Sequence, residues 1–223
     1  MRILIYALPV FAILGNLTLG LFVYSQNRNS RINSTYAVTA VIAALWATAI
    51  FFYSEATTAG EALWRSRLAG AFSSFVPAMF FYFFSVFPRE KDAPKDNLEK
   101  LVFLTAIFFS GLFFSDLLVS GTAIGQNGKY YFVAGPAFVL FIVYFVAIMI
   151  FAFLRLVRKY FQYGGVSKLQ IKYVFFGFFL GSIFPILTNL IIPLFGYSGL
   201  AGIGPFFAVI TVSFISFAIT KTR

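Results

Sequence analysis

Long apolar stretches alternate with short polar gaps along the whole chain, and this alternation dominates the sequence. Seven stretches reach the length of about 20 residues that a helix needs to cross a hydrocarbon core of about 30 Å. They cover approximately residues 3–24, 35–53, 66–87, 101–120, 135–154, 173–194 and 201–219. Charged side chains are almost absent from them. The pattern predicts an all-α membrane protein, with residues 1–223 forming one seven-transmembrane helix bundle.

The basic residues between the stretches predict the orientation of this bundle. Thirteen of the seventeen Lys and Arg residues lie in the first, third and fifth gaps and the C-terminal tail, and four lie on the other side. The four are Arg2, Arg65, Arg67 and Lys129. Cytoplasmic loops of membrane proteins carry an excess of Lys and Arg. We therefore expect the N-terminus outside the cell and the C-terminus in the cytoplasm.

Composition agrees with a membrane protein and excludes several functions. Hydrophobic residues make up 61% of the chain and charged residues 11%, and the net charge of +10 falls on loops that would face anionic headgroups. We therefore expect the lipid bilayer, and no nucleic acid, as the partner of this charge. The chain has no Cys and no His, which removes thiol nucleophiles, the usual zinc ligands and a phosphoryl-accepting histidine. We expect no enzymatic activity and no cofactor.

A small polar group is predicted at the outer side. Asp116 is an acid within the fourth apolar stretch, near its outer end, and Glu55, Glu61, Arg65 and Arg67 lie in the second gap on the same side. An ionisable group at membrane depth is a candidate site. These five residues are candidates for an outward-facing polar mouth. The alternative is a solvated hairpin beside an Asp that caps its helix.

A second candidate group lies at membrane depth. Asn16, Thr188 and Asn189 are polar side chains that we expect to form hydrogen bonds across helices. Pro185 and Pro193 flank Asn189 and predict an irregular sixth helix. Such a helix marks either a ligand or ion site or a hinge within the packing.

Two further patterns concern helix packing. Gly177 and Gly181 form a G-x-x-x-G motif in the sixth helix, which indicates a close contact either within the bundle or in a homodimer. The 33 Phe residues include runs that go all round their helices. Most of these rings must meet lipid or neighbouring helices, and an aromatic pocket for an apolar ligand is the alternative.

The cytoplasmic side carries candidate contacts with headgroups or with an output partner. These are the bases of the fifth gap and the tail, Arg155, Arg158, Lys159, Lys168, Lys172, Lys221 and Arg223. They fit an interfacial segment on anionic lipid, or charge that serves topology alone. The third gap, from Pro88 to Lys100, balances four bases with four acids and reads as a solvated hairpin without a site.

Short motifs along nearly the whole chain give it a resemblance to a known family. They are Asn16 with Gly20-Leu21-Phe22-Val23, Asn29-Ser30-Arg31-Ile32-Asn33, Tyr36-Ala37, Trp46, Trp64-Arg65 with Leu68, Pro77, Phe80, Phe84 to Pro88, Gly128, Tyr130, Gln170-Ile171-Lys172-Tyr173, Gly177 and Gly204-Pro205. In these motifs the sequence resembles the N-terminal seven-transmembrane sensor region of bacterial histidine kinases, a region also found ahead of other signalling output domains.

The resemblance implies a function as well as a fold. It implies a sensory module in the bacterial inner membrane that passes a stimulus through its seventh helix to a cytoplasmic signalling domain or protein. The chain stops at Arg223, where members of this family continue into their output domain. A small seven-helix transporter and an accessory membrane subunit are the alternatives. Comparison of spans one to three with spans five to seven gives no convincing internal repeat of the kind that many transporters have.

Overall fold

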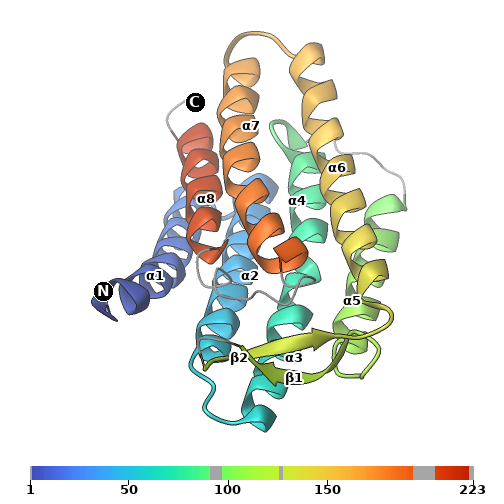
Figure 1. Cartoon of the computed structure of the whole chain (residues 1–223). Helices are drawn as coiled ribbons and strands as arrows, with labels where there is room; N and C mark the ends of the chain where they lie inside the picture. Colours follow the sequence, from blue (N-terminus) through green and yellow to red (C-terminus); the bar gives the residue numbers. More distant parts are fainter. Residues whose placement is uncertain (1, 91–96, 126–127, 193–203, 221–223) are drawn as a thin grey trace.

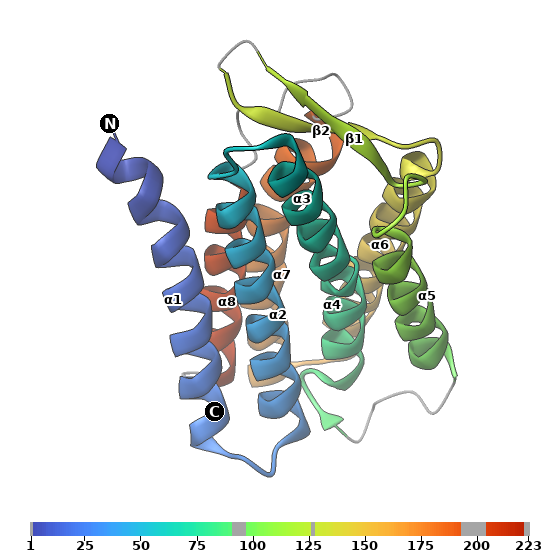
Figure 2. The ribbon, with the colours of Figure 1, turned by 90° about the horizontal axis from the view of Figure 1, so that it is seen from below.

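The computed structural model describes residues 2–90, 97–125, 128–192 and 204–220, which form a helical bundle with a β-hairpin across one end (Figures 1 and 2). The elements are α1 (Arg2–Gln26), α2 (Arg31–Ser54), α3 (Ala59–Ser73), α4 (Phe75–Val86), α5 (Leu98–Leu112), β1 (Val119–Ile124), β2 (Tyr130–Ala134), α6 (Phe138–Gln162), α7 (Gly165–Ile186), the π-helix η2 (Leu187–Ile191) and α8 (Gly204–Thr220). Because α3 runs on into α4 and α7 into η2, the described residues contain seven helical units.

Helix length and surface agree with a multi-pass membrane protein. Within the described residues, five helical segments are long and apolar enough to cross a membrane: Pro9–Gln26, Arg31–Ser54, Ala59–Val86, Phe138–Gln162 and Gly165–Ile191. Phe206–Thr220 adds a shorter apolar helix. On α6, one face packs into the core while Leu140, Val143 and Phe151 are 57–63% exposed. Apolar side chains this large on an open face are consistent with a surface that contacts lipid.

The span from α3 to α4 bends at a proline. Pro77 lies in the first turn of α4, where its ring removes a backbone donor and crowds the carbonyl four residues earlier. The two helices meet at Ser74, which keeps helical backbone angles. The hydroxyl of Tyr144, on α6, donates to the Ser74 carbonyl over 2.8 Å. The bend is thus held by a contact from another helix.

The fourth predicted span, over 101–120, is too long at its C-terminal end. α5 has 15 residues, so its length is about 22 Å at about 1.5 Å per residue. The chain then turns, and the apolar run that continues the predicted span forms β1, which pairs antiparallel with β2. Gly135 lets the return strand approach, because a Cβ there would overlap the backbone of Asp116 and Leu117. The hydrophobic pattern did not predict this hairpin.

The bundle has two ends that differ in character. We call the end covered by β1 and β2 the hairpin end, and the opposite end the basic end (Figure 2). At the basic end α1, α4, α6 and α8 finish and α2, α5 and α7 begin. Between the two ends, the core is built mainly from aromatic, branched aliphatic and small residues of α2, α4, α5, α6, α7 and α8.

Candidate functional site

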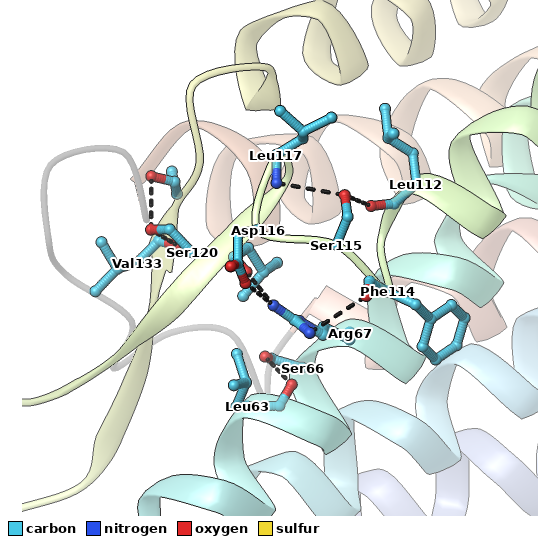
Figure 3. Close-up of polar contacts among 12 residues, drawn as sticks. Leu63, Ser66, Arg67, Leu112, Phe114, Ser115, Asp116, Leu117, Ser120 and Val133 are labelled. Atoms are coloured by element: carbon cyan, nitrogen blue, oxygen red, sulfur yellow. Dashed lines mark hydrogen bonds and ion pairs between the residues drawn. The ribbon is translucent and has the colours of Figure 1, made fainter.

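At the hairpin end, Arg67 of α3 holds the turn that follows α5 (Figure 3). Its Nη2 lies 2.5 Å from Asp116 Oδ1 and donates to the Val119 carbonyl over 2.8 Å, and its Nη1 donates to the Phe114 carbonyl over 3.3 Å. The Arg67 side chain is 15% exposed, whereas that of Asp116 is 84% exposed. Arg67 is therefore anchored by backbone carbonyls as much as by the carboxylate, and Asp116 faces outward from the turn rather than lying inside a helix.

The other residues predicted for an outer mouth form separate local contacts. Arg65 pairs with Glu61, one turn earlier, at 3.4 Å and donates to the Phe52 carbonyl at the end of α2 over 3.0 Å. Lys129, in the turn between the strands, lies 4.0 Å from Glu55. These contacts tie α2, α3 and the hairpin to one another. Exposed pairs of this kind contribute little to stability, so they position the hairpin more than they stabilise it.

Beneath the hairpin lies an apolar cavity, which we call the hairpin-end cavity. Its empty space is about 700 Å³, part of it open to the outside. Its lining residues are Trp46, Ile50 and Tyr53 of α2, Ser66, Ala69, Gly70 and Ser73 of α3, Phe113, Val119 and Phe132 of the hairpin region, Phe138, Phe141 and Phe145 of α6, and Pro185, Asn189 and Leu190 of α7 and η2. A cavity with aromatic walls and few polar groups is the usual form of a small-molecule site.

The sixth predicted span is irregular where it borders this cavity. Pro185 lies in the last turn of α7, and η2 follows it directly. The Thr188 hydroxyl donates to the Phe184 carbonyl over 2.8 Å, and the Asn189 amide donates to the Thr188 hydroxyl oxygen over 3.0 Å. A π-helical turn inside an α-helix often accompanies a functional site. Pro193, also predicted here, lies outside the described residues.

Asn16 behaves differently from the expectation of contacts across helices. Its side chain is fully buried, and its amide donates to the Ala12 carbonyl of its own helix over 2.8 Å. Its Oδ1 has no hydrogen-bond partner within the described ranges of the chain. Thr188 likewise donates within its own helix. At both positions the side chain donates to the carbonyl one turn earlier in its own helix, a local bond that Ser, Thr and Asn side chains often form.

Gly177 and Gly181 lie where α7 packs on α8. A Cβ at Gly177 would overlap Phe214, and one at Gly181 would overlap the Thr211 hydroxyl, so only glycine permits this approach. The Thr211 hydroxyl donates to the Gly177 carbonyl over 2.9 Å. Stacked rings of Phe184 and Phe207, with centroids 4.2 Å apart, continue the contact toward the hairpin end. The G-x-x-x-G motif thus serves a contact inside the bundle.

At the basic end, two bases of α6 point into the bundle. Arg155 Nη1 lies 2.7 Å from Glu99 Oε1 of α5, and its guanidinium carbon lies 4.0 Å from the centre of the Phe81 ring. Arg155 also donates to the Ser85 hydroxyl, which in turn donates to Glu99 over 2.9 Å. The side chains of Arg155 and Glu99 are only 18% and 13% exposed. This buried cluster joins α4, α5 and α6.

Lys159 lies one turn further along α6 and closes the end of α4. Its Nζ donates to the carbonyls of Phe84, Ser85 and Phe87 over 2.8, 2.7 and 2.5 Å. These carbonyls carry the negative end of the α4 helix dipole and lack partners within the helix. Lys159 and Arg155 therefore have intramolecular roles that the sequence did not predict.

The comparisons with known proteins agree with this architecture. Residues 8–223 match the family model described as the N-terminal 7TM region of histidine kinase. The chain belongs to this family. No curated protein matches the sequence. The 7TM region is thus a membrane-embedded input region of histidine kinases, and the family places a cytoplasmic histidine kinase output after it.

The remaining basic residues predicted in the 7TM region differ in exposure. Arg158 and Lys172 are exposed, while Lys168 is half-buried with its Nζ 4.6 Å from the centre of the Tyr160 ring. Lys221 and Arg223 lie outside the described residues. Among the described residues, no group of His, Cys, Asp and Glu could hold a metal ion.

Several polar residues of the basic end were missed by the sequence reasoning. The third gap, from Pro88 to Lys100, was predicted to be a solvated hairpin because its positive and negative charges balance. Yet Glu99 binds Arg155, and Glu90 accepts from the Ser30 hydroxyl over 2.8 Å. One signal was available. Arg155 and Lys159 continue the helical face that includes Ala152 and Leu156, which are fully buried, so their inward direction follows from the periodicity of α6.

Proposed function

We propose that the 7TM region receives a stimulus at its hairpin end, outside the cell, and passes it through α7 and α8 to a cytoplasmic output region. One observation carries this proposal: the same helical unit, α7 with η2, borders the hairpin-end cavity and packs closely against α8. Pro185 and Asn189 line the cavity, while Gly177 and Gly181 contact α8. Since α8 ends at the basic end, a shift of α7 reaches the side from which the chain leads to its output.

The charge distribution supports the orientation. The exposed bases Arg158 and Lys172 lie at the basic end, together with Arg28 and Arg31, while the hairpin end carries Arg65, Arg67 and Lys129 beside three acids. An excess of bases on one side indicates the cytoplasmic face.

Cysteine labelling tests the orientation directly, since the chain has no Cys of its own. Ile124 is 64% exposed in the hairpin and Gln162 is exposed at the basic end. In whole cells, a membrane-impermeant maleimide should label Ile124→Cys, and label Gln162→Cys only after the membrane is opened. The reverse pattern would overturn the orientation.

Transmission requires two arrangements of the bundle whose free energies differ by only a few kcal/mol, so that a stimulus can change their populations. The α7–α8 contact suits such a rearrangement, because its closest points include glycines, aromatic rings and a hydroxyl hydrogen bond. A contact of small and apolar groups can shift without leaving a charge unpaired.

The transmission step is tested with the catalytic region of a histidine kinase joined after Arg223. The double substitution Gly177→Leu with Gly181→Leu separates α7 from α8 and should change autophosphorylation at least about fivefold in either direction, a usual size for coupling between sites. Gly111→Leu is the matched control, because Gly111 lies in α5 with no atom near its missing Cβ. Unchanged autophosphorylation and stability in the double variant would contradict the proposal.

A further inference from the structure

One residue that lines the hairpin-end cavity, Asn189, has a buried side-chain oxygen without a hydrogen-bond partner among the described residues. The Asn189 amide nitrogen donates to the Pro185 carbonyl over 3.3 Å and to the Thr188 hydroxyl oxygen over 3.0 Å. The Oδ1 of the same amide is buried and accepts no hydrogen bond from the part of the chain that the structure describes. Buried polar atoms are nearly always paired in proteins, so an orphaned acceptor on a residue that lines the cavity indicates a donor that it accepts from when the cavity is occupied.

The hydroxyl groups of the cavity wall differ from Asn189 in this respect. The Tyr53 hydroxyl accepts from the Phe132 backbone nitrogen over 2.8 Å. The hydroxyls of Ser66 and Ser73 donate to carbonyls one turn earlier in α3, over 2.8 and 2.7 Å. Within the described part of the wall, Asn189 Oδ1 is thus the atom that calls for a hydrogen-bond donor.

The rest of the wall sets the chemistry of an occupant. It is formed mostly by aromatic and aliphatic side chains, among them Trp46, Phe141 and Phe145, and the described lining residues include no charged side chain. Burying an ion without a partner charge is costly, so the occupant is uncharged. A saturated lipid chain alone fills the space but gives Asn189 no donor.

We propose that the hairpin-end cavity binds a small, uncharged, mostly apolar molecule that donates one O–H or N–H group to Asn189 Oδ1. The assignment rests on the proposed function, because the ligand would act on α7 at its irregular segment between Pro185 and Asn189. Molecules of this chemistry have two sources. They come either from the outer solution or from the outer leaflet, where lipids that carry a hydroxyl group have the same chemistry.

Trp46 makes the proposal measurable, because it lies in the cavity wall and the chain has two Trp residues. Trp64, the other one, is 59% exposed and contacts the Phe114 ring, so Trp64→Phe keeps an aromatic side chain there and leaves Trp46 as the only indole. The probe is para-bromobenzyl alcohol, whose bromine quenches indole fluorescence at short range. Its methyl ether is the matched probe without a donor.

In phosphatidylcholine vesicles containing the Trp64→Phe chain, the alcohol should quench Trp46 along a saturating curve, and the ether should need about tenfold higher concentration, since one hydrogen bond is lost. Asn189→Leu should make the two probes equal. Ala69→Phe, which places a ring in the cavity, should abolish saturable quenching by both. Circular dichroism and the emission spectrum of Trp46 check that each variant is folded.

Two results would overturn the assignment. One is quenching that rises linearly for both probes in step with their partition into the bilayer. The other is an alcohol preference that survives in folded Asn189→Leu. Adding dioleoylglycerol to the vesicles separates the two sources: competition with the alcohol indicates a lipid ligand, and lack of competition a solute from outside. The quenching assay measures binding without any kinase. Saturable quenching together with unchanged autophosphorylation would therefore contradict the proposed transmission but not the proposed binding site.

Discussion

Helices α4, α5 and α6 are joined at the basic end by charged and hydrogen-bonded contacts, whereas α7 and α8 are joined by small and apolar ones. In the first group, Arg155 binds Glu99 and Ser85, and Lys159 closes the end of α4. In the second, Gly177 and Gly181 meet α8. A half-buried ion pair has one favourable geometry and is costly to separate. A glycine contact tolerates sliding. We therefore propose that α4, α5 and α6 form a fixed frame and that α7 and α8 are the moving part.

The largest loss of stability is expected when the Arg155 guanidinium is removed. Arg155→Met leaves the Glu99 carboxylate without its guanidinium in a place that is only 13% exposed, and we expect a loss of about 3 kcal/mol in the free energy of unfolding. Denaturation of the purified chain in mild detergent measures it. Arg158→Met is the control, because Arg158 is exposed on the same helix. A loss under about 1 kcal/mol would show that the cluster does not hold the frame.

Lys159 provides a smaller test of the same frame. Lys159→Met keeps most of the side-chain length but removes the donor to the carbonyls of Phe84, Ser85 and Phe87. We expect a loss of about 2 kcal/mol, within the usual range for hydrogen bonds from a charged group. Hydrogen exchange should show the larger change in the last turn of α4 and little in α8. Equal changes of hydrogen exchange in α4 and α8 would contradict the distinction between the frame and the moving part.

A substitution at Thr211 tests the α7–α8 contact, and its expected effect on stability is the smallest of the three. Thr211→Val removes the hydrogen bond to the Gly177 carbonyl at similar volume, at a cost of about 0.6 kcal/mol, the average for such bonds between membrane helices. With a kinase joined after Arg223, this variant should alter autophosphorylation while the amount of folded protein stays unchanged. Arg155→Met should lower both in proportion. Thr211→Val that behaves like Arg155→Met would contradict the separation.

Sequence reasoning located the helices well because membrane-spanning helices need long apolar runs and few charges, a pattern visible without any structure. It failed after Leu112, where the apolar run of Leu117, Leu118 and Val119 continues as a β-strand. A short apolar run carries no period that separates strand from helix, and the deciding contacts come from Arg67, far away in the sequence.

The candidate site was predictable in part. The proline and asparagine pattern of 185–189 indicated an irregular helix, and the structure has a π-helix there. Sequence reasoning could not show that Asn189 meets Trp46 and Phe141 around one cavity, since these residues come from three helices. The inward direction of Arg155 was likewise hidden, because its partner Glu99 lies in a gap whose charges balance.

The most direct test of the central claim measures whether α8 moves against the frame when the hairpin-end cavity is filled. Spin labels on introduced Cys residues at Arg158 and Phe217 report the distance from α6 to α8, and labels at Leu101 and Leu154 report α5 to α6. All four positions are exposed. Pulsed electron resonance in vesicles compares the chain with its Ala69→Phe variant. If α8 moves against the frame, the α6–α8 distance distribution changes and the α5–α6 distribution stays the same. A change in α5–α6 of the same size, or no change in α6–α8, would contradict this movement.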